Sequence, residues 1–424
     1  MHHLSIILIL LLFLCFGLLS RRIDGSAVTA PMIFVAAGLV LSDGLLGAVD
    51  FEIERGLLHL LLEATLVLVL FSDAANINLG DLRRDHNVPQ RMLLVGMPLS
   101  IALGAAVAYA LPLGLTVCEA ALVAAILAPT DAALGQSVIE SKAIPARIRR
   151  ALNVESGLND GFALPVVLIL ASTASAIATE NMTDWFRFAA LQLLSGCAVG
   201  IALGFAGALL LNRADARGWV SASGQGIISL SLAALSFILA EALHGNGFIA
   251  AFIAGLVFGN RLNKSCGSLL AFVRTEGQLL TLSAFFFFGA LLLPDALAQM
   301  TPWHWAFALM SLTLLRMLPV ALSLGGMKLH TPTQLFLGWF GPRGLASILF
   351  VLLVLSETVL QSAQTIASLV FITVLLSVML HGASAAPLAR VYGAISATWP
   401  QCAEHSENRG DERDEGGAPA RGVA

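Results

Sequence analysis

Long apolar stretches, separated by short polar segments, recur from one end of this chain to the other. Most approach the roughly 20 residues that an α-helix needs to cross the hydrocarbon core of a bilayer. The pattern predicts an all-α membrane protein of about thirteen transmembrane helices, forming one transmembrane domain over residues 1–400. The predicted segments are 4–20, 27–46, 57–77, 93–113, 118–139, 151–179, 186–211, 226–243, 248–260, 269–293, 303–324, 333–356 and 365–388.

The composition supports a membrane location and excludes several classes of function. Hydrophobic residues make up 58% of the chain and charged residues only 12%, against about 25% charged residues in soluble domains. The lipid bilayer is therefore the expected partner, and the net charge of −4 gives no sign of a nucleic-acid partner. No His-Glu-x-x-His motif, phosphate-binding loop or cysteine pair with zinc-ligand spacing is present. We therefore expect neither an enzyme nor a bound cofactor.

The distribution of basic residues predicts the orientation of the chain. With the N-terminus outside, 18 of the 23 Lys and Arg residues fall on the cytoplasmic side, and the outer loops keep only Arg55 and Arg187. Cytoplasmic loops of membrane proteins carry such an excess. This predicts a multi-pass protein of the cell (inner) membrane with a cytoplasmic C-terminus. Residues 401–424 are polar and read as a disordered cytoplasmic tail.

Two of the apolar segments contain a proline at corresponding places. Pro129 lies in the fifth segment and Pro342 in the twelfth, within Gly-Pro-Arg-Gly at 341–344. Proline lacks a backbone donor and disrupts the preceding helical turn. The two segments run in opposite directions, a pattern typical of inverted repeats whose discontinuous helices cross at a binding site near the midplane. The alternative is that each proline only kinks a continuous helix.

The sixth segment carries the chemistry-bearing side chains. Glu155 and Asn159 are four residues apart and share one helix face, while Ser156 and Asp160 share the neighbouring face. A carboxylate inside the membrane is costly and usually marks a substrate or proton path. Carboxylate, hydroxyl and backbone oxygens, such as those near Thr130, are the ligands that hard cations prefer. The sequence therefore predicts that a proton and a small monovalent cation compete for Asp160.

Three further charged residues lie near these segments. Asp131 follows the first break and is either a ligand or a capping residue there. Asp73 is either part of the cation's access path or a solvated helix-end residue. Arg343 needs a partner inside the membrane, and we expect this partner to be Glu155, which would leave Asp160 available.

The motifs resemble those of one known family. They are Thr130-Asp131, Glu-Ser-Gly-Leu-Asn-Asp-Gly at 155–161, His-Gly-Asn-Gly-Phe at 244–248 with the run at 254–260, and Gly-Pro-Arg-Gly at 341–344. Together they resemble the NhaP-type sodium/proton antiporters, relatives of the animal sodium/proton exchangers in the monovalent cation:proton antiporter superfamily. The resemblance covers nearly the whole membrane region. Ala132 stands where many members have proline, and Asp73 stands in a Ser-Asp-Ala context where many have Glu-Gly.

The resemblance implies a fold, an activity and a role for each site residue. It implies a core and a dimerisation subdomain, a homodimer, and exchange of one cation, sodium above all, for one proton. Asp160 would bind either the cation or the proton, and Thr130 and Ser156 would supply oxygen ligands. Asp131 would act on the cation indirectly, through a water molecule or through the ligand residues that it contacts. Asn159 would hold the broken helices in place, and Glu155 and Arg343 would form a structural pair. A potassium/proton antiporter of the same fold is the alternative, whereas a channel would need a filter motif that the chain lacks.

Overall fold

The computed structural model describes residues 2–23, 26–42, 45, 55–77, 79–80, 86–131, 134–175, 182–262, 267–399 and 404. Every regular element among these residues is helical. The predicted disordered tail, 401–424, lies outside the described residues except for Glu404. This side chain is buried and accepts hydrogen bonds from the backbone N–H of His330 (2.9 Å) and the hydroxyl of Thr333 (2.8 Å).

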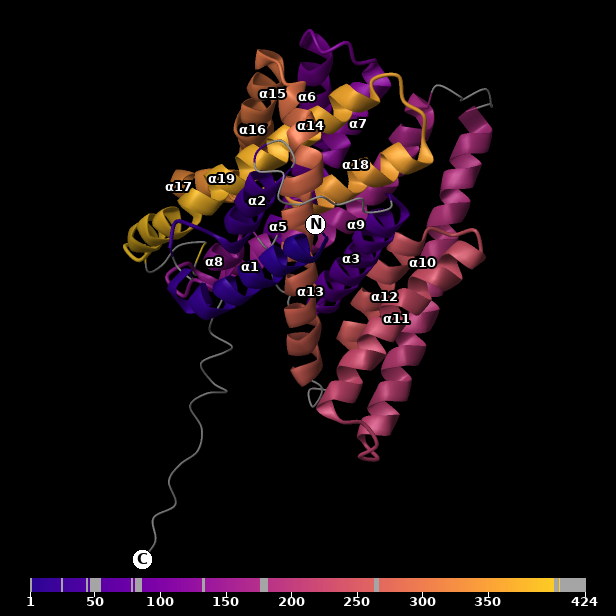
Figure 1. Ribbon diagram of the computed structural model, residues 1–424. Helices are drawn as coiled ribbons and strands as arrows, with labels where there is room; N and C mark the ends of the chain where they lie inside the picture. The colour runs from indigo at the N-terminus through magenta and orange to yellow at the C-terminus, as the bar shows by residue number, and fades with distance from the viewer. Residues whose placement is uncertain are drawn as a thin grey trace, which may run out of the picture.

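The helices follow the predicted apolar segments along the chain (Figure 1). In chain order they are α1 (His2–Ile23), α2 (Ala30–Leu41), α3 (Arg55–Ala75), α5 (Asn87–Arg91), η1 (Met92–Gly96), α6 (Met97–Ala110), α7 (Val117–Ile126), α8 (Gln136–Ile139), α9 (Ala146–Ala174), α10 (Met182–Asp215), α11 (Ala222–Ala242), α12 (Gly247–Arg261), α13 (Gly267–Phe287), η3 (Phe288–Leu292), α14 (Leu293–Ala298), α15 (Pro302–Leu312), α16 (Leu314–Ser323), α17 (Thr331–Trp339), α18 (Leu345–Glu357) and α19 (Ala363–Ser396).

The lengths and apolar character of these helices identify a multi-pass membrane protein. Among the described residues, eight helical stretches are long and apolar enough to cross a membrane, and four shorter apolar helices accompany them. Several helices extend beyond the predicted segments. For example, α9 begins at Ala146 and α19 ends at Ser396. The apolar pattern ends where polar residues begin, but a helix continues through polar residues as long as its backbone hydrogen bonds continue.

Both predicted helix breaks are present. Helix α7 ends at Ile126, and the backbone around Pro129 is not helical before α8 begins. Helix α17 ends at Trp339, and α18 begins only at Leu345, after Pro342. Because a proline cannot donate to the ladder, each break leaves backbone carbonyls and N–H groups without helical partners in the middle of the molecule. These groups create the need for specific side chains at the crossing.

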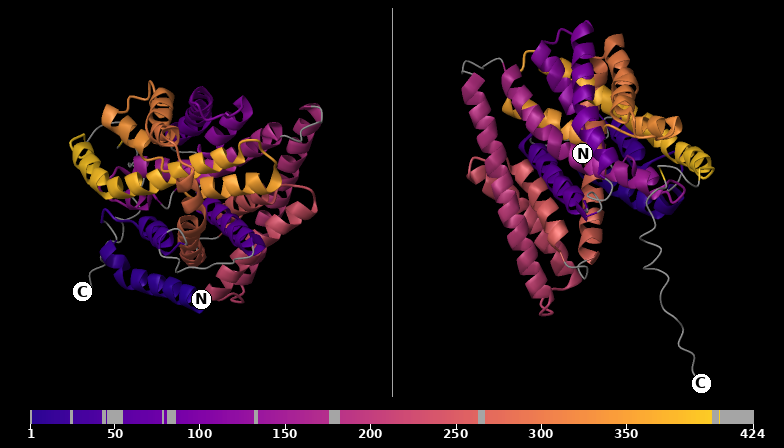
Figure 2. Two further views of the ribbon diagram at one scale, coloured as in Figure 1. Left: turned by 45° about the horizontal axis from the view of Figure 1, so that its top comes forward. Right: turned by 180° about the vertical axis from the view of Figure 1, so that it is seen from behind.

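Two groups of helices surround the breaks. Helices α10, α11 and α12 pack against one another, with α3 beside them, and form one side of the molecule in both figures (Figures 1 and 2). Helices α7, α18 and α19 meet on the other side, and α19 runs past both broken helices. Helix α9 contacts α3, α7, α10 and α18, so it lies between the two groups. Four of its polar residues, Glu155, Ser156, Asn159 and Asp160, are buried there.

Candidate functional site

The two breaks are joined by direct hydrogen bonds. The backbone N–H of Asp131 donates to the carbonyl oxygen of Pro342 at 2.8 Å. The N–H of Leu345, the first residue of α18, donates to Oδ2 of the Asp131 side chain, also at 2.8 Å. Asp131 therefore caps the N-terminus of α18 from the other repeat, and its negative charge is stabilised by the positive end of that helix dipole.

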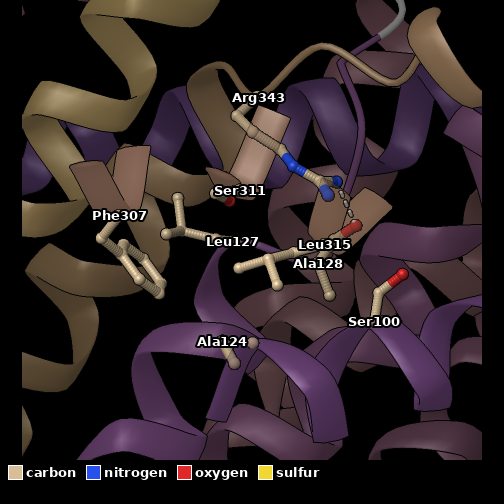
Figure 3. A pocket seen from close by; sticks show the side chains of 9 residues that line it. Ser100, Ala124, Leu127, Ala128, Phe307, Ser311, Leu315 and Arg343 are labelled. Carbon is tan, nitrogen blue, oxygen red and sulfur yellow. Dashed lines mark hydrogen bonds between the residues drawn. The ribbon is translucent and has the colours of Figure 1, made fainter. Parts of the chain in front are cut away.

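Arg343 makes the corresponding contact in the opposite direction. Its Nη1 donates to the carbonyl oxygens of Ala128 (2.6 Å) and Pro129 (3.1 Å), just beyond the C-terminus of α7. Figure 3 shows the guanidinium reaching across a small cavity toward Ala128. The hydroxyl of Ser347 donates to the carbonyl of Ile126 at 2.8 Å. A cation at the C-terminal end of a helix is stabilised by the partial negative charge there.

The close approach of the two breaks requires a small residue at position 344. A Cβ atom built on Gly344 would overlap the carboxylate of Asp131. Any larger residue would therefore push Asp131 away from the N–H of Leu345. The glycine after Arg343 thus sets how closely the two repeats approach each other at the crossing.

Helix α9 brings its polar face against the first break. The hydroxyls of Thr130 and Ser156 lie 3.1 Å apart, and Nδ2 of Asn159 donates to Oγ1 of Thr130 at 2.6 Å. All three side chains are buried. Asn159 thus fixes Thr130 against α9, and the two hydroxyl oxygens lie on the same side as Asp160, which follows Ser156 by about one turn.

Asp160 is the most exceptional group in this cluster. Its side chain is 6% exposed, and its Oδ1 has no hydrogen-bond partner among the described residues. The carboxyls of Asp73 and Asp131 lie close enough to interact electrostatically with it. A buried acceptor without a partner typically costs about 1–3 kcal/mol, and more when it is charged. The site is therefore suited to take up a positive charge, either a proton or a cation.

The predicted ion pair between Glu155 and Arg343 is wrong. Oε1 of Glu155 accepts from Nη2 of Arg316 at 2.5 Å, and both side chains are 2% exposed. Arg343 instead donates to the backbone carbonyls at the first break, and Glu155 acts on its charge only without direct contact. Gly341 makes room for Arg316, because a Cβ atom at this position would overlap its guanidinium. The pair therefore ties α9 to α16 beside the second break.

Comparison with known proteins places this arrangement in a family. Residues 7–391 match the family described as "Sodium/hydrogen exchanger, transmembrane". The chain belongs to this family. A solved structure similar to this exchanger-family chain is that of the sodium proton antiporter MjNhaP1 from Methanocaldococcus jannaschii at pH 8. The two share 19% sequence identity with a TM-score of 0.74, over 91% of this chain and 97% of the other. The crossed discontinuous helices thus belong to the antiporter fold.

Curated relatives of this exchanger-family chain carry names that mention potassium. The K(+)/H(+) antiporter NhaP of Alkalimonas amylolytica is 26% identical over 403 residues, covering 92% of this chain and 67% of the relative. The K(+)/H(+) antiporter NhaP2 of Shewanella baltica (strain OS223) is 26% identical over 271 residues, covering 64% of this chain and 46% of the relative. The chain thus spans less than half the length of the NhaP2 relative.

The structure brings most of the predicted site residues together and adds others. Thr130, Ser156 and Asn159 form one cluster, to which Asp160 adds its carboxyl. Asp131 joins the crossing through its capping contact, and the partly exposed Asp73 lies near the C-terminal end of α3. Sequence reasoning missed Ser347, and it did not assign Arg316 to Glu155. The position of Arg316 within an apolar segment signalled that it needed a partner. Nothing in the sequence showed which of the two arginines, Arg316 or Arg343, pairs with Glu155.

Proposed function

We propose that this protein is a secondary transporter that exchanges a monovalent cation for protons by competition at Asp160. The observation that carries the proposal is the buried Asp160 carboxyl, whose Oδ1 has no partner among the described residues, beside the hydroxyls of Thr130 and Ser156. A proton and a cation both neutralise the charge of this carboxylate. Because they compete for the same oxygens, the carboxylate cannot bind both tightly at the same time. Each ligand therefore displaces the other.

Each neighbouring residue has a proposed role in this exchange. Thr130 and Ser156 supply oxygen ligands to the cation, and Asn159 holds Thr130 in place. Asp131 adds negative potential while capping α18, and Asp73 lies on the cation's access path. The breaks at Pro129 and Pro342 turn backbone dipoles toward the site. Because water is largely excluded from these buried groups, their electrostatic effect on the bound charge is strengthened.

The exchange is electroneutral in this proposal. Asn159 precedes Asp160 in place of a second carboxylate, so one ionisable group changes state in each half of the cycle. One proton then moves in one direction for each monovalent cation that moves in the other, and no net charge crosses the membrane. The transporter works as a homodimer in the cell (inner) membrane. Its N-terminus is outside and its C-terminus in the cytoplasm, an orientation that the basic residues of the loops favour.

Sodium is the proposed cation, and potassium is the alternative. Hard oxygen ligands around a single carboxylate suit either ion. The two curated relatives described above are named for potassium, whereas the structurally similar MjNhaP1 and a further curated relative, an uncharacterized exchanger of Mycobacterium bovis, are named for sodium. The two ions differ in size, so the spacing of the ligand oxygens selects between them.

Exchange in proteoliposomes tests this proposal. Vesicles with an imposed proton gradient and an internal pH dye receive sodium, potassium or lithium in separate experiments, and protein-free vesicles serve as the control. We expect sodium to dissipate the proton gradient, with the same end point whether or not valinomycin and potassium clamp the membrane potential. Dissipation by potassium alone would select the alternative cation. A lack of response to any of the three cations would contradict cation/proton exchange, and an end point that follows the clamped potential would contradict electroneutrality.

A further inference from the structure

A pair of buried polar residues on α19 lies directly behind the second helix break. Ser377 and His381 are four residues apart, so their side chains share one face of the helix. Ser377 is 0% exposed and His381 1% exposed. Neither residue belongs to the cluster around Asp160. A buried polar pair needs hydrogen-bond partners, and here the broken backbone provides them.

The two residues bind the backbone on both sides of the break. Nε2 of His381 lies 2.9 Å from the carbonyl oxygen of Trp339, the last residue of α17. Oγ of Ser377 accepts from the backbone N–H of Arg343 at 2.6 Å. The carbonyl of Trp339 and the N–H of Arg343 belong to the backbone groups that a helix break leaves without helical partners. One face of α19 therefore holds the two ends of the break at a fixed separation.

A neutral His381 ring with hydrogen on Nε2 satisfies the contacts to the Trp339 carbonyl and to the Ser377 hydroxyl together. Because Nε2 faces a carbonyl oxygen, it carries the hydrogen and donates. Nδ1 lies 3.2 Å from both Oγ and the backbone carbonyl oxygen of Ser377, and in the neutral ring it accepts the hydrogen of the hydroxyl. The same Ser377 oxygen then accepts from Arg343. A doubly protonated ring would place a further positive charge beside Arg316 and Arg343, both of which are near enough to interact with it electrostatically. The neutral ring with hydrogen on Nε2 fits the surroundings.

The brace formed by Ser377 and His381 is connected to the candidate cation site by two sets of hydrogen bonds, one made by Arg343 and one by Leu345. Arg343, held by its N–H, extends its guanidinium to the carbonyls of Ala128 and Pro129. Leu345, two residues further on, donates to Asp131. Thr130 lies between these two anchoring points. A shift of the second break would therefore displace the backbone that carries Thr130 relative to Asp160.

We propose that His381 is a positioning residue for cation binding: together with Ser377 it fixes the second break, and through Arg343 and Asp131 it fixes the position of Thr130. This inference rests on the proposed function for its transport readout. The geometry itself can be tested without transport, through the protection of the backbone at residues 339–345.

Two substitutions separate the contact with Trp339 from general packing. In His381→Gln the side-chain amide nitrogen reaches about as far as Nε2 and keeps a donor for the Trp339 carbonyl. In His381→Asn the shorter amide reaches only the position of Nδ1 and loses that donor. Ser384→Ala is the matched control, because it removes the acceptor for the indole N–H of Trp339 (2.9 Å) and leaves the contact to the Trp339 backbone intact.

We expect His381→Asn to raise the KM for the cation about tenfold, which corresponds to about 1.4 kcal/mol, with little change in the rate at saturating cation. His381→Gln and Ser384→Ala should keep a KM close to that of the parent. Hydrogen exchange should be faster at residues 339–345 in the Asn variant only. A uniform loss of folded protein with an unchanged KM would overturn the positioning role, as would an equal rise in KM for Gln and Asn.

The two proposals fail in different ways. If the parent protein exchanges no cation for protons, the proposed function fails, whereas faster hydrogen exchange confined to residues 339–345 of His381→Asn still supports the brace. If the parent transports normally and this segment is equally protected in the Asn, Gln and parent proteins, the brace is overturned and the proposed function stands. Thermal melting in detergent identifies which variants are folded before either comparison is made.

Discussion

Asp160→Asn is expected to abolish cation/proton exchange in a protein that still folds and inserts into the membrane. The amide has nearly the same size as the carboxyl, so packing within α9 is preserved. It cannot carry the negative charge that binds a cation, and it does not take up and release a proton near neutral pH. Exchange should therefore fall to the level of protein-free vesicles.

The same substitution should not lower stability, which separates a functional role for Asp160 from a structural one. The carboxyl interacts unfavourably with Asp73 and Asp131, and its Oδ1 lacks a partner among the described residues. Removing the charge relieves the repulsion and lowers the cost of burying an oxygen without a partner, because a neutral amide costs less to bury than a carboxylate. Thermal melting in detergent should give a midpoint equal to or above that of the parent. Asp295→Asn, an exposed position on α14, is the control and should transport normally. If Asp160→Asn dequenches the pH dye in response to the cation at the rate of the parent, Asp160 is not the residue that binds the cation and the proton.

The ion pair between Glu155 and Arg316 is expected to dominate stability at the centre of the molecule. Glu155→Ala and Arg316→Ala should each lower the free energy of unfolding by about 3–5 kcal/mol, because each leaves an opposite charge buried without its partner. The double variant Glu155→Ala/Arg316→Ala should cost much less than the sum of the two single effects, because no buried charge is then left without its partner. The two single effects should therefore be strongly non-additive.

Arg343 supplies the matched comparison for this ion pair. Its guanidinium is held by carbonyls rather than by Glu155, so the effects of Arg343→Ala and Glu155→Ala should be closer to additive. Denaturant titrations in detergent, combined in double-mutant cycles, measure both coupling energies. A larger coupling of Glu155 to Arg343 than to Arg316 would restore the pairing expected from the sequence and contradict the observed geometry.

The sequence predicted those features of the fold that depend on local properties of the chain. Apolar runs located the helices because a membrane helix must bury about 20 consecutive residues in lipid. Pro129 and Pro342 located the breaks because a proline interrupts the hydrogen-bond ladder of a helix. Proline alone does not decide a break, because Pro165, Pro319 and Pro387 lie inside α9, α16 and α19. The spacing of Ser156 and Asp160 predicted a shared face of α9, since helical periodicity does not depend on the rest of the fold.

The features that the sequence did not predict depend on contacts between distant segments. Two arginines, at positions 316 and 343, were available to Glu155, and only the packing of α9 against α16 and the breaks determines which of them pairs with it. Asp131 had two possible roles until the N–H of Leu345 was placed beside its carboxylate. The brace at His381 was not anticipated either, because a single histidine in an apolar helix carries no signal of the backbone that it faces.

The dependence of cation affinity on pH tests the central claim most directly. Cation titrations of exchange in proteoliposomes, repeated at several pH values, give an apparent affinity and a maximal rate at each pH. If one carboxyl binds either ligand, the apparent affinity should weaken about tenfold per pH unit over the range in which Asp160 is mostly protonated. The rate at saturating cation should stay nearly constant, because excess cation displaces the proton. A cation affinity that does not change with pH, accompanied by a maximal rate that falls with acidification, would contradict competition at a single carboxylate.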